Sequence, residues 1–133
     1  MRKTGVALLV SGFLIAAVPA HAHHSFAAEF DITKPVQLEG TVVKMEWVNP
    51  HIYLHVEVTE PDGSTAVWAI EGGSPMALLR AGVRRDALKP GMRVVIHGFL
   101  AKNGKKMANG GDVVFTDGLK FSLASSAGKT ENK

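Results

Sequence analysis

The chain has 133 residues, no cysteine and a formal net charge of +3 at neutral pH. This length suits a single domain. The lack of cysteine excludes a thiolate metal site, a cysteine nucleophile and a redox dithiol. A domain of this size buries roughly two-thirds of its unfolded surface, so it needs no disulfides to fold.

Residues 1–22 have the pattern of a secretory signal peptide. Arg2 and Lys3 are basic, residues 6–18 are largely apolar, and Ala20-His21-Ala22 matches an A-x-A cleavage site. The apolar run is shorter than the ~20 residues that span a bilayer. We therefore expect a periplasmic or secreted protein, cleaved after Ala22 and without a stable membrane anchor. Cleavage after Ala20 is the alternative.

The mature domain is close to neutral. Removal of 22 residues from 133 leaves 111, and the loss of Arg2 and Lys3 lowers the net charge from +3 to +1. A nearly neutral domain gives no electrostatic reason to expect nucleic acid as a partner.

The first predicted element is a long strand over residues 36–48, after a polar leading segment over residues 23–34. Its hydrophobic alternation changes parity midway, near Gly40. The members of the first set are Val36, Leu38 and Val42, and those of the second are Val43, Met45 and Trp47. This change predicts a bend or bulge, as is common where a sheet coils into a barrel.

A hairpin and a short helix follow. The strand over 52–59 alternates, with Ile52, Leu54, Val56 and Val58 on one face and His51, Tyr53, His55 and Glu57 on the other. The turn over 60–63 joins it to a strand over 65–71. Ser74-Pro75 predicts the start of a helix over 76–81, which ends at Gly82.

The remaining elements complete the expected fold. They are a strand over 93–100, a loop over 101–111, a hairpin of strands over 112–115 and 119–123, and a disordered tail over 124–133. The order predicts an all-β domain over 23–123 with one short helix, similar to the OB-fold, a small five- to six-stranded Greek-key barrel. An open β-sandwich is the alternative.

Three of the six histidines lie within residues 21–24. Cleavage after Ala22 would make His23 the first residue, so its α-amine and Nδ1 could chelate one ion. Cleavage after Ala20 would place histidine third, a spacing that suits square-planar Cu(II) or Ni(II). Both outcomes favour Cu(II), because imidazole is a good ligand for it. The alternative is a mobile histidine-rich end that binds metal adventitiously.

The predicted metal ligands are His23, His24 and His51. Four residues at ~3.3 Å each separate His51 from His55 by ~13 Å, so both cannot bind one ion. His51, at the strand end, is the better ligand. Its alternative role is a hydrogen bond within the Asn49-Pro50 turn.

Other polar residues have weaker indications. Tyr53 and His55 share a polar strand face and are the predicted contacts for a protein, peptide or glycan partner in the cell envelope. Glu71 could bind across the barrel mouth, with a surface charge at a strand end as the alternative. His97 is expected to be a half-buried packing residue, and Lys102, Lys105 and Lys106 a solvated hairpin tip. No spacing assembles a catalytic set, so we do not expect an enzyme.

Four motifs resemble a family of uncharacterised bacterial exported proteins. They are His23-His24-Ser25-Phe26, Trp47-Val48-Asn49-Pro50-His51, Gly73-Ser74-Pro75 and Leu88-Lys89-Pro90-Gly91. The resemblance covers nearly all of the mature chain and implies export and a small β-barrel. It implies no established activity, so no catalytic residue is carried over.

Overall fold

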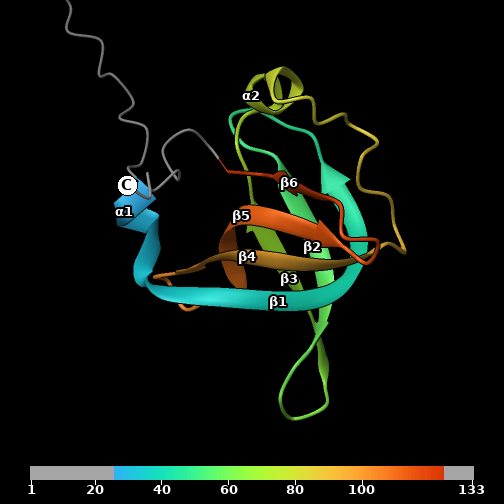
Figure 1. Ribbon diagram of the computed structural model, residues 1–133. Helices are drawn as coiled ribbons and strands as arrows, with labels where there is room; N and C mark the ends of the chain where they lie inside the picture. Colours follow the sequence, from blue (N-terminus) through green and yellow to red (C-terminus); the bar gives the residue numbers. More distant parts are fainter. Residues whose placement is uncertain (1–25, 125–133) are drawn as a thin grey trace, which may run out of the picture.

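A computed structural model describes residues 26–124 of the chain (Figure 1). The predicted signal peptide, His23, His24 and residues 125–133 of the predicted tail lie outside this part. The described elements are α1 (Phe26–Glu29), β1 (Phe30–Glu46), β2 (Tyr53–Thr59), β3 (Thr65–Glu71), α2 (Pro75–Arg80), β4 (Arg93–Ala101), β5 (Met107–Phe115) and β6 (Lys120–Ser122).

The sheet closes on itself to form a barrel. Antiparallel pairing gives the order β3-β2-β1-β4-β5-β6, and a parallel β3–β5 ladder joins Ala69–Glu71 to Met107–Asn109. With α2 between β3 and β4, this is the element order of an OB-like Greek-key barrel. The predicted all-β class is therefore confirmed, and the open sandwich is wrong because the β3–β5 ladder closes the sheet.

The bend in β1 is confirmed. Its register against β2 shifts between Val42 and Lys44, and Val43 between them is 42% exposed. The backbones of β1 and β2 are in close contact at Gly40, where a Cβ would lie 2.2 Å from the Glu57 carbonyl oxygen. The predicted start at residue 36 is wrong, because the strand begins at Phe30, which pairs with Ala101 of β4.

The predicted loop over 101–111 is also wrong beyond residue 106, where β5 begins. Gly110, within this predicted loop, marks close packing between strands. Gly110 pairs with Gly98 of β4, and a Cβ on Gly98 would lie 1.9 Å from the Asn109 carbonyl oxygen. A Cβ on Gly110 would lie 2.7 Å from Cγ2 of Ile70. Only glycine lets these strands approach so closely.

The predicted core and helix are confirmed. Ile52, Leu54, Val56 and Val58 are buried, and the Ser74 hydroxyl caps α2 by accepting a hydrogen bond from the Ala77 N–H. α2 lies over one end of the barrel, away from the β2–β3 turn (Figure 1). Buried Leu78, Val83 and Leu88 from α2 and the following segment join the core there.

We predict that Gly98→Ala destabilises the fold more than Gly63→Ala. The new Cβ at position 98 meets backbone, which should cost at least ~3 kcal/mol. Gly63 has a φ of 84° but nothing within 4 Å of an added Cβ, so its change should cost only ~1 kcal/mol. Denaturant unfolding followed by tryptophan fluorescence measures both; equal losses would contradict the close approach.

Candidate functional site

A cavity of about 440 Å³ lies against the outer face of β2 and β3. Tyr53 and Glu71 are directly opposite each other in the β2–β3 ladder, on the face away from the core. The cavity is lined by Ala28, Glu29, Phe30, Tyr53, Glu71, Ala101, Lys102, Asn103 and Met107. Strands 2 and 3 and the loop between strands 4 and 5 form the face that OB-folds use for ligands.

Helix α1 forms one wall of this cavity and is held there by several contacts. The Phe26 ring lies 5.5 Å from that of Phe30 and 6.1 Å from that of Phe99, measured between centroids. The Lys102 backbone N–H donates to the Glu29 carbonyl, and its ammonium donates to the Ala27 carbonyl. Helix α1 is therefore fixed to the barrel beside the cavity.

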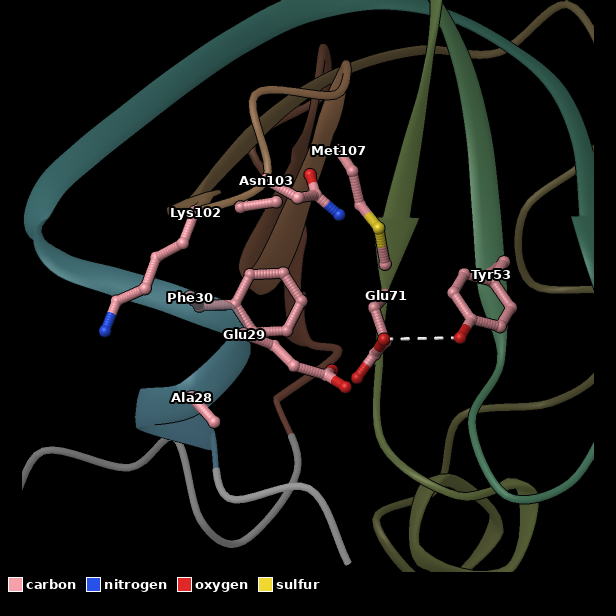
Figure 2. A pocket seen from close by; sticks show the side chains of 9 residues that line it. Ala28, Glu29, Phe30, Tyr53, Glu71, Lys102, Asn103 and Met107 are labelled. Carbon is pink, nitrogen blue, oxygen red and sulfur yellow. Dashed lines mark hydrogen bonds between the residues drawn. The ribbon is translucent and has the colours of Figure 1, made fainter.

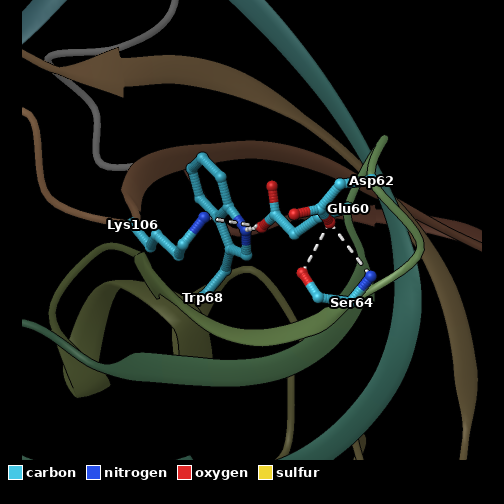
Figure 3. Close-up of polar contacts among 5 residues, drawn as sticks. All are labelled: Glu60, Asp62, Ser64, Trp68 and Lys106. Atoms are coloured by element: carbon cyan, nitrogen blue, oxygen red, sulfur yellow. Dashed lines mark hydrogen bonds and ion pairs between the residues drawn. The ribbon is translucent and has the colours of Figure 1, made fainter.

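The loop over residues 102–106 is held at its other end by the cluster in Figure 3. Lys106 Nζ lies 2.8 Å from Glu60 Oε1 and 5.6 Å from the Trp68 ring centroid. Trp68 Nε1 donates to the same Glu60 oxygen. Lys106 is exposed, as expected for a solvated loop, but its pairing with Glu60 fixes this end of the loop, as the Lys102 contacts fix the other.

Glu71 is the central polar group of the site. Glu71 is only 6% exposed, so the alternative expectation, that it is a surface charge, is wrong. The Tyr53 hydroxyl donates to Glu71 Oε2 at 3.2 Å, and His51 Nδ1 lies 3.8 Å from Oε1. Figure 2 shows the carboxylates of Glu29 and Glu71 pointing toward one another.

The protonation of Glu71 follows from these surroundings. Burial raises the pKa of its carboxyl, and the Glu29 charge raises it further, against the lowering effects of His51 and the Tyr53 hydrogen bond. The pKa of Tyr53 is also raised, first by burial and then by the Glu71 charge. The cavity holds two carboxylates, those of Glu29 and Glu71, and a bound cation would relieve the repulsion between them.

His51 lies just before β2 and contacts the end of β3. Its Nδ1 is 3.1 Å from the Gly72 carbonyl oxygen. A carbonyl only accepts, so Nδ1 is the donor in this contact, and Nε2 is the ring nitrogen left to bind a ligand. The predicted alternative, a bond within the Asn49-Pro50 turn, is replaced by this bond to Gly72. A ring nitrogen held by a backbone carbonyl is the usual arrangement around a metal-binding histidine.

The structure separates His55 from His51. His55 Nε2 is buried without a hydrogen bond and lies 3.5 Å from Glu46 Oε1. Tyr53 and His55 do share the outer face of β2, but only Tyr53 lines the cavity. His97 is exposed, so the expectation of a half-buried packing residue is wrong.

Within residues 26–124, no three His, Asp or Glu side chains converge closely enough to hold a metal ion by themselves. The predicted ligands His23 and His24 lie outside that range. Over the same residues, no helix is long and apolar enough to cross a membrane.

Comparison with known families identifies the domain. A family model described as a family of unknown function, DUF6152, matches residues 11–110. The chain belongs to this family. The match spans the cavity-lining residues from Ala28 to Met107. No curated protein and no solved structure matches the chain.

Glu71→Gln should change how stability depends on pH. The folded-state pKa of Glu71 is raised above its usual 4.5. The unfolded carboxyl therefore ionises first, and stability falls as pH rises from ~4.5 through the raised value. Glutamine does not ionise, so the free energy of unfolding of the wild type relative to Glu71→Gln should decline over this window. Glu57→Gln, at an exposed position on β2, is the charge-matched control, and the free energy of unfolding of the wild type relative to this control should show no such decline. The assignment would be contradicted if the wild type declined relative to Glu57→Gln but not relative to Glu71→Gln.

Proposed function

We propose that this protein is an exported, non-enzymatic OB-like barrel that binds Cu(II) at the end of its β2–β3 face. His51 would supply one imidazole from the barrel. His23, with its α-amine after cleavage, and His24 would supply the remaining nitrogen ligands. One observation carries this proposal. Helix α1, which closely follows the N-terminal histidines, is fixed beside Glu71, and Glu71 lies 3.8 Å from Nδ1 of His51.

Chain length supports the proposal. His24 precedes the cavity-lining residue Ala28 by four positions, which an extended chain spans in at most ~14 Å. α1 is held against the cavity by Phe26 and Lys102. His23 and His24 precede the anchored residue Phe26 by only three and two positions, which supports a site near the cavity rather than elsewhere on the barrel.

Chemistry supports Cu(II) in particular. Nitrogen-rich sites follow the affinity order in which Cu(II) exceeds the other divalent first-row metals. Glu71 adds a carboxylate next to His51, which can orient the imidazole or neutralise the ion. Export fits the same proposal, because the sequence before His23 has the signal-peptide pattern.

We predict that His51→Gln weakens Cu(II) binding at least tenfold in calorimetry on the correctly processed protein. Loss of one of three or four ligands gives an effect of this size. His97→Gln removes an exposed histidine on β4 and is the matched control. One extra residue before His23 should also weaken binding, because it removes the amine chelate. Equal affinities for all four proteins would contradict the proposal.

A second candidate is a module that binds a protein, peptide or glycan partner in the envelope without metal. The cavity favours it, since Tyr53, Asn103 and Lys102 bring hydrogen-bonding groups to the face that OB-folds use. A different set of variants separates the two candidates. Changes of Tyr53 or His55 would weaken capture of an envelope partner, whereas removal of His23 and His24 would leave it intact.

A further inference from the structure

The end of the barrel covered by α2 carries a concentration of positive charge. Residues 26–124 contain 11 basic and 11 acidic side chains, so this part of the chain is neutral. The segment over 75–91 alone has four basic residues and one acidic residue. The basic residues are Arg80, Arg84, Arg85 and Lys89, and all four are exposed. The cap formed by residues 75–91 is therefore positive, and the rest of residues 26–124 carries a matching negative charge.

Apolar side chains are exposed on the same cap. Met76 is 56% exposed and Leu79 is 51% exposed, although α2 buries Leu78 in the core. A surface depression of about 420 Å³ is lined by Leu79 together with Arg84, Arg85 and Asp86. Leu79 of α2 thus shares one surface with Arg84 and Arg85 of the following segment.

We infer that the α2 cap docks on a lipid bilayer with anionic headgroups. Arginine binds phosphate strongly and keeps its charge at any physiological pH. Exposed apolar residues beside basic ones are typical of segments that lie in the membrane interface. The only acidic group on the cap, Asp86, is paired with Arg84 at 3.6 Å, with both side chains largely exposed. This leaves Arg80, Arg85 and Lys89 for headgroups.

The geometry of the barrel suits this docking. α2 lies at the end opposite the β2–β3 turn (Figure 1). The cavity residues come from α1, from the loop over 102–106 and from the five strands β1 to β5, and none comes from the cap. The inference therefore uses other residues than the cavity, and it does not depend on the proposed metal site.

The test is co-sedimentation of the processed protein with vesicles, in a chelator so that no metal ion bridges the two. Phosphatidylglycerol-containing vesicles should bind the protein and purely zwitterionic vesicles should not. Each basic residue near such a surface contributes about fivefold to partitioning. Arg80→Gln with Arg85→Gln should therefore weaken binding roughly 25-fold, and Met76→Gln with Leu79→Gln should weaken it as well.

Lys105→Gln with Lys120→Gln is the matched control, because it removes two exposed charges elsewhere. An equal loss in this control, or no vesicle binding at all, would overturn the inference. Arginine-dependent binding of an acidic polypeptide without vesicle binding would also overturn it, in favour of a protein partner.

A second readout uses the absence of cysteine. Met76→Cys and Val67→Cys each give a unique site for an environment-sensitive dye, and both positions are exposed. Anionic vesicles should shift the emission of the dye at position 76 to the blue and leave that at position 67 unchanged. Equal shifts would show that the cap is not the contact.

Discussion

The structure depends on the parallel contact between β3 and β5, which closes the sheet. Two glycines permit the close approach of the strands around it: Gly98 lets β4 approach the backbone of β5, and Gly110 leaves room for Ile70 of β3. In the same ladder Glu71 pairs with Asn109. Closure therefore places the Glu71 carboxylate, at the end of β3, beside α1 and the loop over 102–106, which cover it.

The burial of Glu71 then shapes the site. An ionised carboxylate out of water is costly unless it is paired or hydrogen-bonded. Here Tyr53 donates to Glu71 and His51 lies close by, while Glu29 opposes it. Such an incompletely compensated charge in a cavity is typical of functional positions. It is the reason to propose a cationic ligand at this end of the barrel.

Much of the fold could be predicted from the sequence because local signals were clear. Alternation over β2 identified its core face, Ser74-Pro75 located the helix start, and the parity change in β1 indicated its bend. The first half of β5 is the main exception. The composition around Gly110 predicts a loop, because a local pattern does not contain the long-range approach of Gly110 to Gly98.

The site was only partly predictable for a similar reason. His51 and Tyr53 were recognised from the polar face of one strand. Glu71 was assigned to the surface, since its burial depends on α1 and on the loop over 102–106. One signal in the sequence points to its burial: Glu71 is the single acidic residue at the end of an apolar strand, directly before Gly72. Met107 and Lys102 join the cavity through the tertiary fold alone.

The central claim is that the N-terminal histidines and His51 bind one ion against the barrel. Paramagnetic line broadening by Cu(II) in amide NMR spectra of the processed, ¹⁵N-labelled protein tests it most directly. The account predicts that substoichiometric Cu(II) broadens the signals of Ala28, His51 and Gly72, while Gly63 at the hairpin turn stays sharp. Broadening confined to the first few residues, with His51 and Gly72 unaffected, would contradict it.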